Sequence, residues 1–207
     1  IKGFLKDYND LVKSVDVAYN AASSKGYEPL TSDEKDAMSD DEVKKWEEKI
    51  KDSLLRKDST LGSVLDTMKN DMAKSFKVGD KSYSLSSFGI ATLEYFNSPE
   101  TEPGVYHIDG NKDDTYTSAN TDKLKSMIAS DPDTVITFFS QLASQLYKDL
   151  GSKMTASSTS SAYTIYNDKQ MNTQYSEYNT KISEAEDKVT TWEDYYYSKF
   201  SAMESAL

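Results

Sequence analysis

Apolar residues at the two ends of the chain follow a heptad spacing. Near the N-terminus the apolar positions step alternately by four and three along Ile1, Leu5, Tyr8, Val12, Val15, Tyr19 and Ala22. The same alternation joins Met171, Tyr175, Tyr178, Ile182, Ala185, Val189, Trp192 and Tyr196, before Phe200, Met203 and Leu207 step by four, three and four. An average step of 3.5 residues keeps one face of a helix against another helix. Each stripe therefore needs a partner, either within this chain or in a second subunit.

Helical patterns continue between these two ends. The first helix is predicted from Ile1 to about Ser24, before Gly26 and Pro29. A short acidic helical turn starts at Ser32, and Ser39 caps a helix with Glu42 in the capping-box position. Further helix starts are predicted at Asp58, at Asn120, at Pro132 and at about Asn167. The last helix, continued to Leu207, would be roughly 60 Å long.

The periodicity changes in the middle of the chain. Residues 76–78 and 82–85 flank a predicted turn at Gly79 and Asp80, and residues 89–96 and 105–108 are typical of strands. These patterns predict a small antiparallel sheet. The fold class is therefore α+β and predominantly helical: a long, antiparallel, coiled-coil-like helix bundle with a small antiparallel sheet inserted in the middle.

Four segments are expected within one structural domain. Residues 1–25 form the N-terminal helix of the bundle, and residues 26–151 form a head of helices and sheet. Residues 152–166 are a connector rich in Ser and Thr, and residues 167–207 form the C-terminal coiled-coil helix. Because Ile1 already lies inside a helical pattern, we expect the chain to be a piece of a longer protein.

Composition narrows the classes of partner. The net charge of −11 repels phosphate groups, so nucleic acid and anionic membrane surfaces are poor partners. Apolar runs are too short to cross a bilayer, so no membrane insertion is expected. The chain has no Cys, which excludes disulfides and thiolate chemistry. Its 15 Tyr residues suit thin bundles and hydrated interfaces, since a Tyr ring buries a large area while its hydroxyl group stays in water.

No catalytic or metal motif is evident. The one His, His107, alternates with Tyr106 and Ile108 and is predicted to be a half-exposed strand residue. Asp109, Asn111 and Asp113 match the first ligand positions of a calcium loop, but the required Gly and Glu positions hold Asp114 and Asn120. A polar turn is the better interpretation. Glycine-rich phosphate loops are also missing, so we expect neither an enzyme nor a bound cofactor.

Six segments, in order along the chain, resemble a known family. They are FLKDYNDLV at 4–12, MSDDEVKKWEEK at 38–49, LLRKDSTL at 54–61, SLSSFGI at 84–90, DKLK and DPDTV at 122–135, and YYYSKFSAME at 195–204. Together they are similar to the C-terminal region of the bacterial flagellar filament-cap family, which is one of the flagellar hook-associated proteins. Residues 105–120 depart from the family pattern, because the link into the following helix is longer here.

The resemblance implies an extracellular protein at the tip of the bacterial flagellum, exported through the flagellar secretion channel. Such a protein assembles as a homo-oligomeric ring and promotes the folding and polymerisation of flagellin. Flagellin, the hook-filament junction protein and a flagellar export chaperone are the implied partners besides the chain itself. The outer domains of the family would lie upstream of Ile1.

The helix seams are the candidate interface. The predicted interface residues are Leu5, Tyr8, Val12, Val15, Tyr19, Tyr175, Tyr178, Ile182, Val189, Trp192, Tyr196, Phe200 and Met203. The Tyr-rich stripe from Tyr175 to Tyr196 would make a hydrated interface weaker than a Leu/Ile seam, or else pack inside one subunit. Two other functions stay open at this point: an adhesin that binds surfaces at the flagellar tip, and an acidic coiled-coil scaffold with no ordered sheet.

Overall fold

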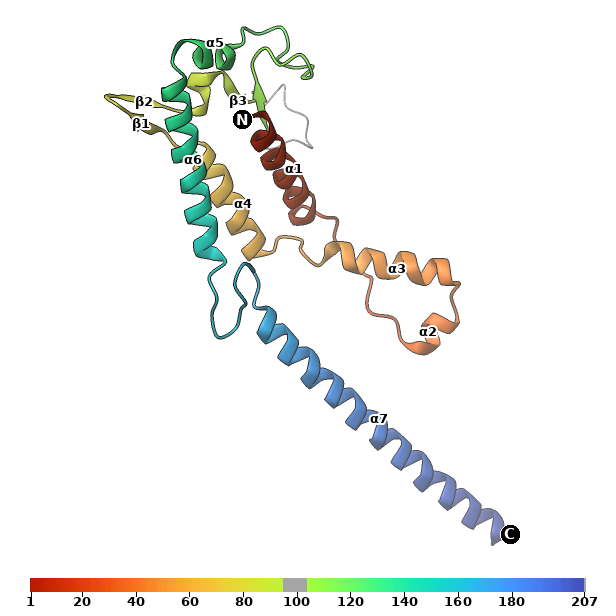
Figure 1. Cartoon of the computed structure of the whole chain (residues 1–207). Helices are drawn as coiled ribbons and strands as arrows, with labels where there is room; N and C mark the ends of the chain where they lie inside the picture. The colour runs from red at the N-terminus through yellow and green to blue at the C-terminus, as the bar shows by residue number, and fades with distance from the viewer. Residues whose placement is uncertain (95–103, 207) are drawn as a thin grey trace. The chain divides into compact units, whose positions relative to one another are not determined.

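The computed structural model of this chain describes residues 1–94 and 104–206. The chain divides into two compact units, Ile1–Lys153 and Met154–Leu207. The first unit holds the helices, strands and 3₁₀ turn α1 (Lys2–Tyr19), α2 (Ser32–Asp36), α3 (Asp40–Ser53), α4 (Ser59–Met72), β1 (Phe76–Val78), β2 (Lys81–Tyr83), η1 (Leu85–Phe88), β3 (Ile90–Thr92), β4 (Tyr106–Ile108), α5 (Lys123–Ser130) and α6 (Pro132–Lys153). The second holds α7 (Asp168–Ser205). The predominantly helical α+β class is confirmed (Figure 1).

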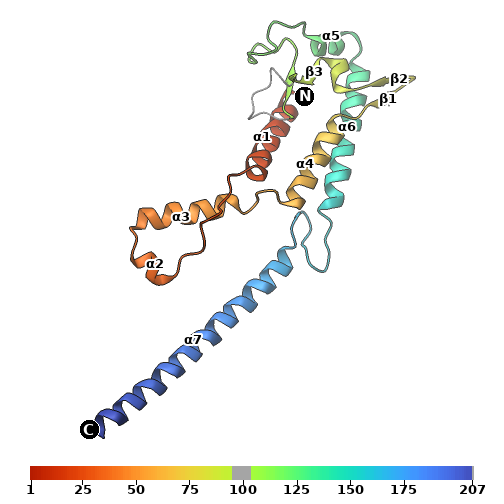
Figure 2. The same cartoon turned by 180° about the vertical axis from the view of Figure 1, so that it is seen from behind.

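The core of the first unit lies between α4 and α6. Figures 1 and 2 show these helices side by side, with α1 beside α4. Helical spacing explains the pairing, because each helix buries residues three or four positions apart. The buried apolar residues are Leu61, Val64, Leu65, Met68 and Met72 of α4, and Val135, Phe138, Leu142 and Leu146 of α6. Phe88 of η1 completes this core with its ring centroid 4.8 Å from that of Phe138.

Side-chain caps begin α3 and α4 where the sequence predicts them. The Ser39 side chain accepts a hydrogen bond from the Glu42 N–H, and the Glu42 carboxylate accepts one from the Ser39 N–H. Hydrogen bonds from the Ser39 hydroxyl and backbone lower the pKa of Glu42. The Asp58 carboxylate accepts from the Leu61 N–H at 2.8 Å. These bonds satisfy backbone donors that the first turn of a helix leaves free.

The strands form two antiparallel pairs, where the sequence predicts a single small sheet. Phe76 faces Tyr83 in the β1–β2 pair, and Ile90 faces Ile108 in the β3–β4 pair. The 3₁₀ turn η1 separates the pairs and takes Leu85 out of its predicted strand. It ends at Gly89, whose φ of +68° lies in the left-handed region that Gly adopts readily. The strand predicted for 89–96 covers Ile90–Thr92, and residues 95 and 96 lie outside the described part of the chain.

Two predicted helix boundaries are wrong. Helix α1 ends at Tyr19 and not near Ser24, because the Tyr19 carbonyl accepts the Lys57 N–H at 2.8 Å. The Arg56 guanidinium donates to the Ala21 carbonyl at 2.7 Å. These tertiary bonds replace the helical ones, and no local signal in the sequence reveals them. Helix α5 starts at Lys123 and not at Asn120, since its first turn is capped by the carboxylate of Asp122.

Candidate interface surfaces

The N-terminal heptad stripe is covered within the first unit. Leu5 and Val12 are 2% and 0% exposed, and Tyr8 is also buried. Val15 and Tyr19 are half-buried at the end of the same face. Helix α1 contacts α4, and the Tyr8 and Tyr106 rings lie 5.7 Å apart. Packing inside the unit therefore accounts for the spacing of these five predicted interface residues, and their place in an interface between subunits stays a prediction.

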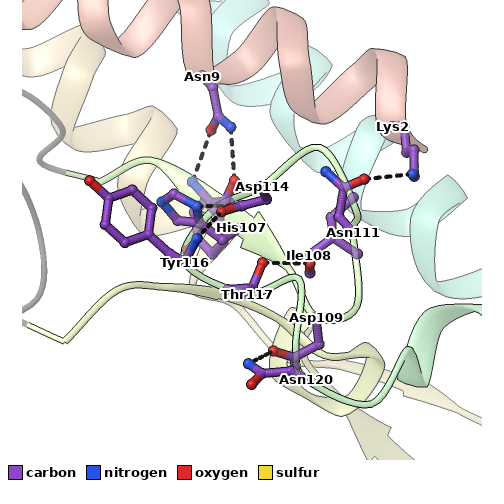
Figure 3. A network of polar contacts seen from close by, with 11 residues as sticks. Lys2, Asn9, His107, Ile108, Asp109, Asn111, Asp114, Tyr116, Thr117 and Asn120 are labelled. Atoms are coloured by element: carbon purple, nitrogen blue, oxygen red, sulfur yellow. Dashed lines mark hydrogen bonds and ion pairs between the residues drawn. The ribbon is translucent and has the colours of Figure 1, made fainter.

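Polar bonds fix α1 to strand β4. The Asn9 amide donates to the Tyr106 carbonyl at 2.8 Å and accepts the Tyr106 N–H at 2.9 Å, so one side chain continues the strand's hydrogen bonding (Figure 3). The Lys2 ammonium donates to the Asn111 side chain at 2.8 Å. Burial raises the pKa of both Tyr8 and Tyr106. The exposed fractions and these directional bonds together identify this face of α1 as part of the unit's own fold.

The loop after β4 encloses His107, which is buried and not half-exposed as predicted. Its Nδ1 atom lies 2.7 Å from Asp114 Oδ2, and the Tyr116 N–H donates to Asp114 Oδ1 at 2.9 Å (Figure 3). The pattern of alternation could not show that a loop folds back over the exposed side of this strand. Burial alone raises the pKa of Asp114, but the hydrogen bonds from Tyr116 and His107 outweigh it and hold that pKa below its usual range.

The same loop uses its calcium-like residues for internal bonds. Asp109 Oδ1 accepts the Asn120 amide at 2.7 Å, and Asn111 accepts Lys2 (Figure 3). Over residues 1–94 and 104–206, no group of His, Cys, Asp or Glu is arranged to hold a metal ion. The arrangement in Figure 3 therefore orders a loop against α1.

The C-terminal heptad stripe is exposed from Met171 to Met203. Helix α7 has 38 residues, and none of its described residues is buried. Tyr175, Ile182 and Trp192 are 69%, 56% and 59% exposed. The other predicted interface residues of this helix are exposed too: Tyr178, Val189, Tyr196, Phe200 and Met203. So large an exposed apolar stripe is typical of a surface that binds another protein.

Aromatic residues concentrate in the second half of α7. The Trp192 and Tyr196 rings stack with centroids 6.1 Å apart, and Trp192 and Tyr195 meet edge to face at 5.6 Å. A shallow hollow of about 420 Å³ lies among Val189, Trp192, Glu193, Tyr196, Tyr197 and Phe200. Large rigid aromatic side chains around a hollow are typical of the residues that dominate binding energy in protein interfaces.

Charged residues flank this stripe, and the sequence analysis missed them. Lys181 and Lys188 lie on one side of the apolar positions, and Glu186 and Glu193 lie on the other. A heptad assignment carried beyond the apolar positions would have found them. In the described part of the chain, none of the four takes part in an ion pair. The Lys181 ammonium lies over the Tyr178 ring of the same helix, 5.4 Å from its centroid.

None of the helices in the described residues combines the length and apolar character needed to span a membrane.

Comparison with known proteins agrees with the sequence motifs. The family profile described as "Flagellar hook-associated protein 2 C-terminus" matches residues 1–207. The "Flagellar hook-associated protein 2" of Halalkalibacterium halodurans is 27% identical over 132 residues, which cover 64% of this chain and 22% of that protein. The match thus spans about a fifth of the relative's length. No solved structure matches the chain. Because the family profile covers every residue, this chain belongs to the flagellar hook-associated protein 2 C-terminus family.

Proposed function

We propose that this chain is part of the structural cap at the distal end of the bacterial flagellar filament, and that α7 joins cap subunits. The observation that carries the proposal is the exposed heptad stripe of α7 in a chain whose whole length matches this family. A ring-forming protein needs an apolar surface that stays uncovered in the free subunit. Within this chain, helix α7 carries an exposed apolar surface, whereas the matching face of α1 is buried.

The cap would be exported through the flagellar channel and would promote the folding and polymerisation of flagellin. Flagellin, the hook-filament junction protein and an export chaperone remain the expected partners. The role is structural and not catalytic. No described feature favours the adhesin hypothesis.

The Tyr-rich seam would keep the cap subunits associated and still let them move relative to one another as each flagellin subunit is added. Tyr175 and Tyr178 carry hydroxyl groups that stay hydrated at an interface, so they bind less firmly than Leu would. Replacing both with Leu, in the protein that contains this chain, would tighten the seam and slow filament growth. Filament growth at the unaltered rate would contradict the yielding role.

Immunogold electron microscopy of the parent protein on intact flagella tests the cap location. Label confined to the distal tip is the expected result. Label along the filament or on the cell body would overturn the proposal. A strain that carries Trp192→Ala should lose tip label, while Tyr147→Ala, which removes an exposed aromatic ring from α6 of the first unit, should keep it.

A further inference from the structure

The segment that follows α1 has a sequence compatible with a helix. Residues 20–25 are Asn, Ala, Ala, Ser, Ser and Lys, and Gly26 follows them with a φ of +92°. Ala and Lys favour helices, Asn and Ser oppose them only mildly, and a Gly with positive φ commonly follows the end of a helix. The heptad stripe of α1 would also continue to Ala22. Local preference therefore supports one more turn of helix, which these described residues do not form.

Two residues that follow α3 hold this segment in its non-helical form. The Tyr19 carbonyl accepts the Lys57 N–H at 2.8 Å, and the Ala21 carbonyl accepts the Arg56 guanidinium at 2.7 Å. In a longer α1, each of these carbonyls would accept the N–H four residues further along the helix. Each carbonyl thus has two alternative donors, one local and one distant, and the structure uses the distant one.

Lys57 adopts a backbone conformation that its residue type disfavours. Its φ of +55° lies in the left-handed region, which residues other than Gly, Asn and Asp rarely enter. Its ammonium donates to Asn20 Oδ1 and lies over the Tyr19 ring, 4.5 Å from the centroid. Strained backbone persists only where surrounding contacts hold it, and it is typical of switch regions. We call Arg56 and Lys57, with these bonds, the latch.

The latch joins the two ends of an arm, residues 20–57, that carries α2 and α3. All residues of the arm are described, and none of them is buried. The arm holds its own shape, because the Trp46 indole donates to the Glu28 carbonyl at 2.8 Å and the Tyr27 and Trp46 rings lie 4.7 Å apart. A change at the base of the arm would therefore move it as one body and expose little apolar surface.

We propose that residues 20–24 are a two-state switch that sets the position of the arm. With the latch closed, α1 ends at Tyr19, as in the structure. With the latch open, α1 continues for about one more turn, and the arm moves with the end of the helix. The new helical bonds and the release of the Lys57 backbone offset the lost latch bonds, so a protein that binds the arm can select either state. The switch lies within one subunit and goes beyond the proposed function, since it operates wherever the subunit is located.

Two substitutions at one position test the latch. Lys57→Ala and Lys57→Gly both remove the ammonium contacts and keep the N–H, but only Gly enters the left-handed region at little cost. Each is made in the 207-residue chain together with Arg56→Ala, and the helical fraction of residues 20–24 is read from their Cα chemical shifts. The ratio of open to closed chains should be about tenfold higher with Lys57→Ala than with Lys57→Gly. Equal ratios would overturn the proposal.

A further substitution tests whether opening lengthens α1. In the chain with Arg56→Ala and Lys57→Ala, Ala22→Gly should lower the ratio of open to closed chains about fivefold, because Gly disfavours the added helical turn. Ala37→Gly, just after α2, is the matched control and should leave the ratio unchanged. An Ala22→Gly variant that opens as readily as its parent would show that opening does not extend the helix, and the switch would be wrong.

Spin labels measure the movement of the arm, because the chain has no Cys of its own. Glu48→Cys on α3 with Asp66→Cys on α4 reports the distance between the arm and the core, and Glu48→Cys with Asp33→Cys on α2 reports a distance inside the arm. In the Arg56→Ala chain, Lys57→Ala should add a second distance between arm and core that differs by about 5 Å or more, whereas Lys57→Gly should show only the first. The distance inside the arm should stay the same. Helical shifts without the second distance between arm and core, or a changed distance inside the arm, would contradict the proposal.

Urea unfolding distinguishes a local change from a loss of the fold. Because no residue of the fully described arm is buried, every latch variant should keep the cooperative unfolding of the core, with a midpoint close to that of the unaltered chain. A latch variant that loses this transition would show that the arm is part of the core and cannot move separately, which would also overturn the switch.

Discussion

Helices α1 and α7 carry the same apolar alternation and differ in what covers it. Leu5 and Val12 of α1 are enclosed by α4 and by the segment around Tyr106, whereas Ile182 and Trp192 of α7 are more than half exposed. A heptad stripe therefore indicates that a helix face will be covered, but not by what. The covered stripe contributes to the stability of one unit, and the exposed one is left for association.

The polar surroundings of the two stripes differ in the same way. Asn9 and Lys2 of α1 bond to the β4 region of their own unit. On α7, Lys181 and Lys188 carry charges without an ion-pair partner in the described residues. The polar bonds of α1 reach other elements of its unit, whereas those of Lys181 stay within α7, where its ammonium lies over the Tyr178 ring.

The largest expected contrast is in stability. Replacing the buried Leu5 with Ala should lower the free energy of unfolding by about 2–5 kcal/mol, because the change leaves a cavity in the core. Leu11→Ala on the exposed side of α1, and Ile182→Ala on α7, should each change it by less than about 0.5 kcal/mol in dilute solution. Urea unfolding followed by circular dichroism measures all three. Equal losses of unfolding free energy for Leu5→Ala and Ile182→Ala would contradict the claim that the α1 stripe is covered and the α7 stripe is exposed.

The next contrast is in association. Trp192→Ala should weaken the association of α7 by about 2 kcal/mol, which is roughly a thirtyfold rise in the dissociation constant. Tyr147→Ala removes an exposed aromatic ring from α6 of the first unit and should have little effect. Sedimentation equilibrium over a range of concentrations measures both. A Tyr147→Ala loss as large as that of Trp192→Ala would mean that the stripe is not the interface.

Acid should weaken the first unit through Asp114. Because folding lowers its pKa below the ordinary value of 3.8, this carboxylate contributes stability above that pH and loses it as the pH falls through the folded pKa. Asp114→Asn should therefore make the chain less stable at pH 7 and flatten the fall in urea midpoint as the pH drops below about 4. If the urea midpoint of the variant fell with pH as steeply as that of the unaltered chain, Asp114 would not be the source of the acid sensitivity.

The smallest expected effect concerns the Tyr8 hydroxyl. Its oxygen is buried and has no hydrogen-bond partner in the described residues. Tyr8→Phe removes a polar group that gains nothing in the folded state, so stability should stay within about 0.5 kcal/mol or rise slightly. A thermal melt against the unaltered chain measures this. A loss above about 1 kcal/mol would show that the hydroxyl has a partner in solution.

Features encoded within a few residues were predictable from the sequence. The caps at Ser39 and Asp58 and the start of α7 after Asn167 depend on neighbouring residues, and the structure confirms them. The end of α1 at Tyr19 and the burial of His107 depend on Lys57 and Asp114, which bind from elsewhere in the chain. Periodicity could find the two stripes but not their partners, because coverage is a tertiary property.

Hydrogen exchange at low and at high protein concentration tests the central claim most directly. The amides around Leu5 and Val12 should be protected to the same degree at both concentrations, because their own unit covers them. The amides from Tyr175 to Tyr196 should exchange rapidly in dilute solution and become protected as the concentration rises. Protection of α7 that does not depend on concentration would contradict the account, since it would mean that the exposed stripe is not where two copies of the chain meet.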